Sequence, residues 1–368
     1  MRAQNGSQGM CIDNAVNISR GQQVKVLMQS NGSLGQTTGA LFSSLRDRLA
    51  KRGVDCELDL RALPPGILPK FPAMANRLFS GAKKVRGIDV LMVHSAVSLS
   101  LPEIILAKLM GKTVVSYIWD IYPESTIAAG GLRNPFTRLM YGVTEKIGIG
   151  LSDLVLVPSD DYLDSLHSSR HKTWVHPLWP VSSARSVESR DSNASPAKIV
   201  FAGQINSIRG IGPAIIRLAC MYPAVQLQLD VFSKDRLPDD LSAGQALPGN
   251  LLVNHKGFRP QKELEVQLPE YDFGLVAISD EFPLPAFPSK ALTYMMAGLP
   301  IIYSGPHQAA LVSTIKSLDL GLYLNGDGGL PQGLPYAGSE FEQGRDEYLR
   351  RVSVAEARLV DFFFSSAK

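Results

Sequence analysis

Short apolar runs alternate with stretches of helical spacing along most of the chain, and this pattern predicts an α/β protein. The apolar run 24–28 is followed by a polar, glycine-containing turn and then by a helix over about 38–52, with Leu41, Leu45 and Leu49 on one face. This order is typical of the start of a doubly wound parallel sheet. Further strands of the first half are expected at 54–60, 88–93, 112–118, 153–159 and 172–177.

A second series of strands and helices begins near residue 198. The preceding segment, 182–196, is rich in Ser, Asn and Asp and poor in large apolar residues, which indicates a linker. The 368 residues exceed what one hydrophobic core usually organises, so we expect two domains, 23–181 and 197–341. In the second domain a helix is expected over about 211–221, and strands at 198–202, 226–232, 251–255, 272–278 and 301–303.

Composition excludes several classes of protein. The net charge of +3 is small and no nucleic-acid-binding motif occurs, so we expect no nucleic-acid partner. The three cysteines lie far apart, without metal-ligand spacing, which fits a reducing compartment. Residues 1–22 are polar and lack the apolar run of a signal peptide, which predicts a disordered tail. No window approaches the roughly 18 consecutive apolar residues of a transmembrane helix, so we expect a cytoplasmic protein.

One segment of the first domain is both basic and amphipathic. Residues 64–86 combine several prolines with Met74, Leu78 and Phe79 and with five cations. Such a stretch can lie on the anionic, inner face of a cytoplasmic membrane. The alternative is a solvated helix that packs its apolar side on the domain.

The segment 287–303 predicts a loop, a short helix and a buried strand. Pro288 fixes the turn, Ser289 is a good N-cap residue, and Lys290 begins the helix. A helix N-terminus at the carboxyl edge of a parallel sheet favours an anion, and here it carries a hydroxyl group and a cation. The alternative is an ordinary capped helix with a solvated lysine.

Polar residues also follow the strands of the first domain. His94 ends one strand, and Asp120 and Glu124 follow the next, so all three are expected near the edge where open parallel sheets bind ligands. Asp120 could orient or deprotonate a hydroxyl group of a substrate, or it could cap the following turn. His176 and His255 have no partner pattern and are interpreted as structural.

The first turn of the chain contains Asn31, Gly32 and Gly35. Its glycines do not match the G-x-G-x-x-G fingerprint, so no dinucleotide cofactor is indicated. Backbone at such a turn can still approach a ligand, and a plain tight turn is the alternative. No Asp-x-Asp sequence occurs in a suitable place, so no divalent metal is implied.

The second half resembles the carboxyl half of GT-B glycosyltransferases, and most resembles the group-1 (family 4) enzymes that build bacterial surface polysaccharides. The resemblance covers about 24–324. The motifs that carry it are the glycine turn 203–210 and the Pro-Ser-Lys segment 287–303, together with 88–95, 120–125 and 153–159 in the first half.

The resemblance implies two Rossmann-like domains that face a central cleft, with the donor bound by the second domain. Its donor-site positions correspond to Gly203, Gln204, Arg209, Pro288, Ser289 and Lys290. Asp280 and Glu281 precede this loop and could contact donor hydroxyl groups, or they could be solvated loop acids. The family also implies that the terminal segment, 342–368, packs back toward the first domain, whereas its pattern alone fits a helix that closes the second.

Three departures from the family pattern stand out. The arginine of the glycine turn is replaced by Gln204, the glutamate pair by Pro285 and Thr293, and a histidine by Trp119.

The function expected from the resemblance is a hexosyltransferase-type glycosyltransferase, retaining and metal-independent. Its substrate is a nucleotide-sugar, with no separate cofactor, and its acceptor is lipid-linked or a glycan. A sugar-nucleotide epimerase or phosphorylase on the same fold is one alternative. A catalytically inactive partner subunit, which binds a donor or another transferase, is the other.

Overall fold

The computed structural model describes residues 23–30, 37–60, 81–166, 172–186, 196–206, 208–242, 246–307, 309–326 and 333–367. The tail 1–22, most of the basic segment (64–80) and the middle of the linker (187–195) lie outside the described residues. Among the described helices, none is long and apolar enough to cross a membrane.

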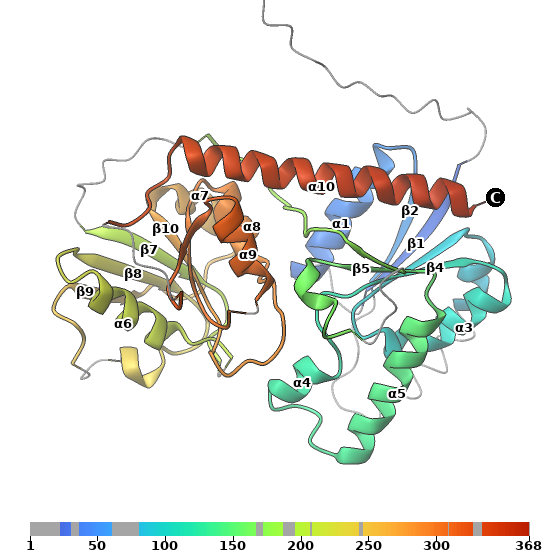
Figure 1. Cartoon of the computed structure of the whole chain (residues 1–368), viewed down its shortest axis with the longest axis horizontal. Coiled ribbons are helices and arrows are strands. Elements are labelled where there is room, and N and C mark those ends of the chain that lie inside the picture. Colours follow the sequence, from blue (N-terminus) through green and yellow to red (C-terminus); the bar gives the residue numbers. More distant parts are fainter. Residues whose placement is uncertain are drawn as a thin grey trace, which may run out of the picture.

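The first sheet has six parallel strands, and every strand expected from the sequence is present (Figure 1). Its spatial order is β2–β1–β3–β4–β5–β6. Successive strands are therefore added on one side of β1 and then, from β3 onward, on its other side. The strands are β1 (Lys25–Ser30), β2 (Asp55–Leu60), β3 (Val90–His94), β4 (Thr113–Tyr117), β5 (Leu154–Val157) and β6 (Thr173–Val175). The helices are α1 (Thr37–Ala50), α3 (Leu101–Leu109), α4 (Glu124–Ala128) and α5 (Pro135–Leu151).

The second sheet repeats this architecture, with six parallel strands in the order β12–β11–β10–β7–β8–β9. Its strands are β7 (Ala197–Ala202), β8 (Leu227–Phe232), β9 (Leu251–His255), β10 (Phe273–Ala277), β11 (Ile301–Ser304) and β12 (Gly321–Tyr323). The helices are α6 (Ile211–Met221), α7 (Gln261–Gln267), α8 (Lys290–Met296), α9 (Ala310–Ser317) and α10 (Ser339–Ser366). Two parallel sheets with flanking helices confirm the predicted class of two Rossmann-like domains.

The terminal helix α10 runs along both domains (Figure 1). Near its start, the Arg345 guanidinium donates to the carbonyl oxygen of Arg185 over 2.7 Å. Further along, Tyr348 Oη donates to the carbonyl oxygen of Leu178 over 2.7 Å. The buried Glu356 pairs with Arg48 on α1, so the second half of the helix is fixed to the first domain. The helix begins at Ser339, three residues before the expected start, directly after Gly338, whose backbone is extended.

Candidate functional site

The two sheets place polar residues at their carboxyl edges, and one pair of these residues interacts electrostatically between the domains. Arg209, from the turn between β7 and α6, interacts electrostatically with Asp120, from the loop after β4. Asp120 is an exposed residue. Desolvation of its carboxyl group by the surrounding protein nevertheless raises the pKa of that group, and the charge of Arg209 opposes the rise. A carboxylate that is both accessible and partly desolvated is expected in a site between two facing domains.

Asp120 is positioned by a serine that the sequence did not single out. Ser95 Oγ accepts the backbone N–H groups of Trp119, over 2.7 Å, and Asp120, over 3.0 Å. Ser95 directly follows β3, whose neighbour in the sheet is β4, so one hydroxyl group fixes the loop where it leaves the sheet. A serine directly after a strand end was the available signal.

Lys290 begins α8, and its amine lies inside the second domain. Nζ is buried, donates no hydrogen bond to any described residue, and lies 3.8 Å from the centre of the Phe201 ring. Burial lowers the pKa of Lys290 well below the ordinary lysine value, and the charge of Arg209 lowers it further. Two cations therefore share a site that has lost much of its hydration, which favours an anionic ligand.

The backbone near Lys290 is fixed by two contacts. Tyr294, one helical turn later, accepts the backbone N–H of Ala202 through its hydroxyl oxygen over 2.9 Å, which ties α8 to the end of β7. Gly203 follows with φ of +138°, and a Cβ there would lie 3.1 Å from Lys290 Nζ. This position thus needs glycine both for its backbone conformation and for the space that the lysine occupies.

The expected cap of α8 is not formed. Ser289 has helical backbone angles, and its side chain makes no capping hydrogen bond. The reason is that Pro288 already accepts the N–H of Ala291 over 3.0 Å, so the helical turn starts before the serine. Ser289 still lies beside Lys290 in sequence, with its hydroxyl not used to cap the helix.

The remaining donor-side residues have mixed surroundings. Asp280 is exposed and engaged by two partners: it pairs with Arg217 at 3.3 Å and accepts a hydrogen bond from Asn325 over 2.6 Å. Glu281 and Gln204 are exposed at the surface. The first-turn residues Asn31, Gly32 and Gly35 lie outside the described residues.

His94 is buried in a cluster of aromatic rings. Its ring centre lies 4.3 Å from that of Trp119 and 5.0 Å from that of Phe42. Burial lowers the pKa of His94 to about 3, so the imidazole is neutral near pH 7. Its ring therefore supports Trp119 from within the domain.

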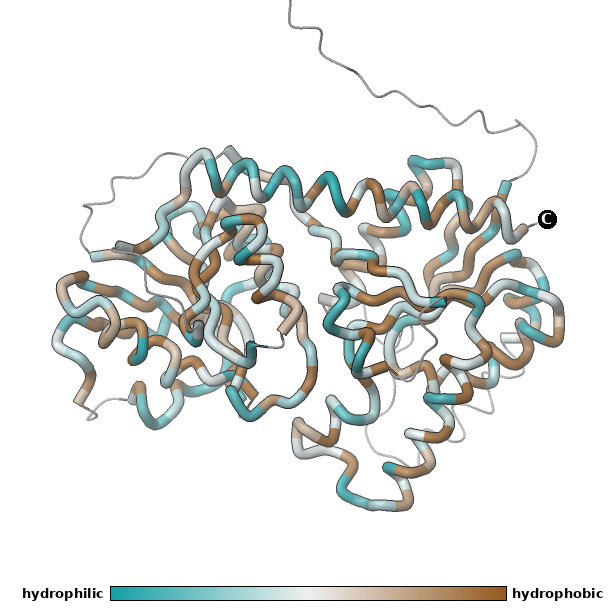
Figure 2. Tube along the Cα trace, viewed as in Figure 1, coloured by the Kyte–Doolittle hydropathy of each residue, from teal (hydrophilic) through white to brown (hydrophobic). Residues whose placement is uncertain are grey.

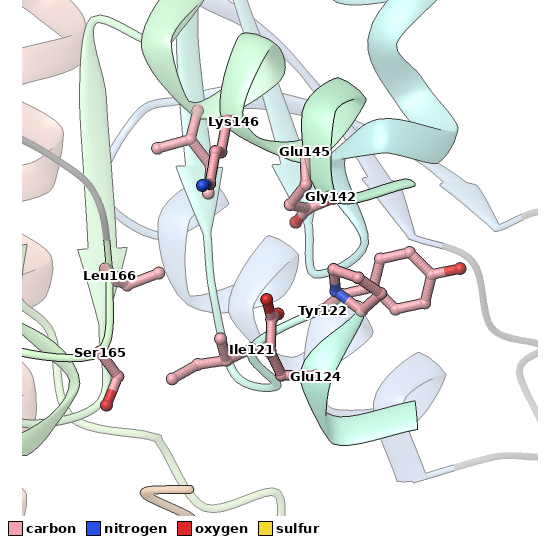
Figure 3. A pocket seen from close by; sticks show the side chains of 10 residues that line it. Ile121, Tyr122, Glu124, Gly142, Glu145, Lys146, Ser165 and Leu166 are labelled. Carbon is pink, nitrogen blue, oxygen red and sulfur yellow. The ribbon is translucent and has the colours of Figure 1, made fainter. Parts of the chain in front are cut away.

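Glu124 follows the Asp120 loop closely and is exposed. It begins α4 and lines a small pocket of about 30 Å³, together with Glu145, Lys146 and Leu166 (Figure 3). Asp120 does not line this pocket. The sequence predicts His94, Asp120 and Glu124 near one another; of the three, Glu124 is the one that lines this pocket beside α5.

No group of three or more His, Cys, Asp or Glu side chains suited to a metal ion occurs among the described residues. No protein-family model and no curated protein sequence matches the chain.

Known structures match the chain over nearly its whole length. A crystallised glycosyltransferase of kitacinnamycin superposes with a TM-score of 0.50 at 14% identity, covering 94% of this chain and all of that one. The calicheamicin glycosyltransferase CalG4 (TM-score 0.45, 13% identity) covers 94% of this chain and 98% of its own. The match to an alpha-glucosyltransferase solved with UDP and a 13-mer DNA (TM-score 0.48, 11% identity) covers 93% of this chain and 95% of that one. The chain has the GT-B fold. Identities this low establish the GT-B architecture and leave the chemistry to the residues of the site.

Proposed function

We propose that the protein is a glycosyltransferase that moves a sugar from a nucleotide-sugar donor to a lipid-linked or glycan acceptor, in the synthesis of a bacterial surface polysaccharide. The observation that carries the proposal is the pair of cations Arg209 and Lys290, with Asp120 of the other domain facing them. A diphosphate would neutralise both cations and supply the hydrogen-bond acceptors that Lys290 Nζ lacks.

The donor would lie across the carboxyl edge of the second sheet. As the glycosidic bond of the donor breaks, negative charge grows on the leaving diphosphate, and fixed cations stabilise that charge without a metal ion. Ser289 would contribute its hydroxyl group, and the backbone at Gly203 and Pro288 would shape the site. Asp280 and Glu281 are the acids placed to contact donor hydroxyl groups.

Asp120 would act on the acceptor. Its raised pKa increases its basicity as a carboxylate, so it can orient or deprotonate a hydroxyl group of the acceptor. His94 would act only as a support for Trp119. Retention of configuration is proposed from the resemblance to family 4 enzymes.

One observation favours a second candidate, a donor-binding subunit without transferase activity. Trp119 stands where the family has a histidine, and it packs among Phe42, His94 and Trp179. An indole has no basic nitrogen to take part in transfer. Such a subunit would use the same cations to hold a nucleotide and would regulate or complete another transferase.

Binding and turnover measured on the same variants separate the candidates. A thermal-shift screen against a panel of nucleotide-sugars identifies the donor, because a ligand that binds only the folded state raises the melting temperature. Hydrolysis or transfer of that donor is then measured for the wild type, Arg209→Ala and Lys290→Ala. Lys316→Ala is the matched control, because this ammonium also lies over a ring, 5.2 Å from the centre of Tyr323.

We expect both site variants to lose binding and turnover while Lys316→Ala keeps them. Full activity of both site variants would refute the assigned donor site. Donor binding by the wild type without any turnover would support the inactive subunit.

A further inference from the structure

Helix α5 of the first domain exposes its apolar side, whereas an ordinary surface helix buries it. The side that packs on the domain carries Thr137, Tyr141, Glu145 and Gly148, all of which are buried. The opposite side exposes four large apolar residues, with 72% of Phe136 and 66% of Leu139 accessible. We call this set the α5 face: Phe136, Leu139, Val143 and Ile147.

Specific contacts hold the helix in this orientation. The carboxylate of Glu145 accepts the backbone N–H of Val97 over 3.0 Å and that of Ser98 over 2.7 Å. Gly148 lets the helix approach closely, since a Cβ there would lie 2.6 Å from a methyl carbon of Val97. Turning the helix to bury its apolar side would break both contacts. The exposure of the α5 face is therefore a consequence of how the domain packs.

A neighbouring helix also exposes large apolar residues. Helix α3 packs against α5 and exposes Ile105 and Leu109. Hydrophobic segments recur along α5, on the outer side of the first domain (Figure 2). Several large apolar residues exposed on neighbouring helices usually mark an interaction site.

The exposed charges on α5 itself, and in the residues just before it, are of one sign, whereas Glu124 of α4 lies beside Lys146. Arg133, Arg138 and Lys146 are exposed on α5 or just before it. The only acid within 132–151 is Glu145, which is buried and engaged by backbone amides, and burial raises its pKa to about 7. A second copy of the chain on this face would bring like charges together. An anionic surface complements them.

We propose that the α5 face docks on an anionic lipid bilayer, with the helix lying in the plane of the interface. A helix with an apolar stripe and flanking cations binds such a surface by burying the stripe and attracting acidic headgroups. The α5 face includes no residue of the basic segment 64–86, and the proposal does not depend on whether the protein transfers a sugar.

Flotation of the full-length protein with vesicles tests the proposal. The wild type is mixed with vesicles of phosphatidylcholine alone or with one third phosphatidylglycerol, and the floating fraction is measured. We expect binding to the anionic vesicles and at least a tenfold loss in the double variant Phe136→Ser/Leu139→Ser. The matched control is Leu252→Ser/Val266→Ser, two apolar residues exposed on the second domain. It should bind like the wild type.

The charge contribution has its own readout. Arg138→Gln/Lys146→Gln should weaken binding to anionic vesicles severalfold, and added salt should weaken wild-type binding in the same way. Equal flotation of the wild type and the Phe136/Leu139 variant would overturn the proposal. So would a wild-type dimer, seen by sedimentation velocity, that dissociates in that variant while neither protein binds vesicles.

Discussion

The amine of Lys290 lies 3.8 Å from the centre of the Phe201 ring, and it has no carboxylate partner among the described residues. A buried cation held only by a ring face and close to Arg209 is costly in the free protein. The arrangement is understandable if the site is built to be completed by an anion. The first two predictions follow from this relationship.

Replacing Lys290 by methionine should raise the stability of the free protein and lower its affinity for a nucleotide. Methionine keeps the volume and the contact with Phe201 but removes the uncompensated charge. We expect unfolding in urea to require about 0.5–2 kcal/mol more free energy. Calorimetric affinity for a nucleoside diphosphate should fall by about 1.5–3 kcal/mol, the range for hydrogen bonds to charged groups. Unchanged affinity would remove Lys290 from the site.

Nucleotide affinity should depend on pH through Lys290. Its pKa is lowered in the free protein, so the ammonium form is present at low pH and is lost as pH rises through that lowered value, below the ordinary value of about 10.4. Because a diphosphate binds the ammonium form, affinity should weaken with rising pH over that window. Lys290→Arg, which stays charged, should flatten the profile. Identical profiles for both proteins would contradict this.

Asp120→Asn should separate chemistry from donor binding. Loss of a general base lowers transfer by about 10²- to 10⁴-fold. Nucleotide affinity should stay equal or increase, because Arg209 loses an anionic neighbour that competes with the ligand. Initial rates and calorimetry on the same preparation provide both measurements. A parallel loss of both would mean that Asp120 shapes the donor site instead.

Gly203→Ala should affect both backbone and site. The backbone angle of +138° is strained for alanine, and the new Cβ would lie 3.1 Å from Lys290 Nζ. We expect a loss of about 1–3 kcal/mol in the free energy of unfolding, together with weaker nucleotide binding. Gly257→Ala is the control: its φ is +70° and the space around it is open, so it should lose stability without losing affinity.

Removing Glu356 should loosen the terminal helix from the first domain. Its carboxylate is 2% exposed and pairs with Arg48 and Arg52, both about one third exposed. We expect Glu356→Ala to lower the free energy of unfolding by about 1.5–3 kcal/mol in urea denaturation. Glu347→Ala removes an acid that pairs with Arg350 and Arg351 on the surface of the same helix, and it should leave stability unchanged. Equal effects of the two would argue against the contact.

Hydrophobic patterning predicted the fold well because each buried parallel strand is a local apolar run. The run 272–278 became β10 (Phe273–Ala277), fully buried, without any long-range information. Patterning failed where distant residues decide. The neutral state of His94 depends on burial among rings from α1 and from the loop after β4, which are distant in the sequence.

The exposed side of α5 was missed for a related reason. The apolar spacing of α5 is typical of a helix, and the apolar side of a helix is normally the buried one. Glu145 is the residue that reverses this orientation, because its carboxylate finds backbone donors only after Val97 and Ser98 are in place. A lone acid among apolar helix positions was the signal available in the sequence.

The chain passes between the two domains twice, in the segment after β6 and again in α10. Two hydrogen bonds join these passages: Arg345 to the carbonyl oxygen of Arg185, and Tyr348 to that of Leu178. Because the two connections are bonded to each other, they form a single line of contact about which the domains could rotate. A rotation of the domains about that line would displace residues near Tyr348 least and those at the far rim most, which spin-label distances between Glu281 and Ser125 would measure. Such a rotation would lengthen or shorten the distance between Arg209 and Asp120.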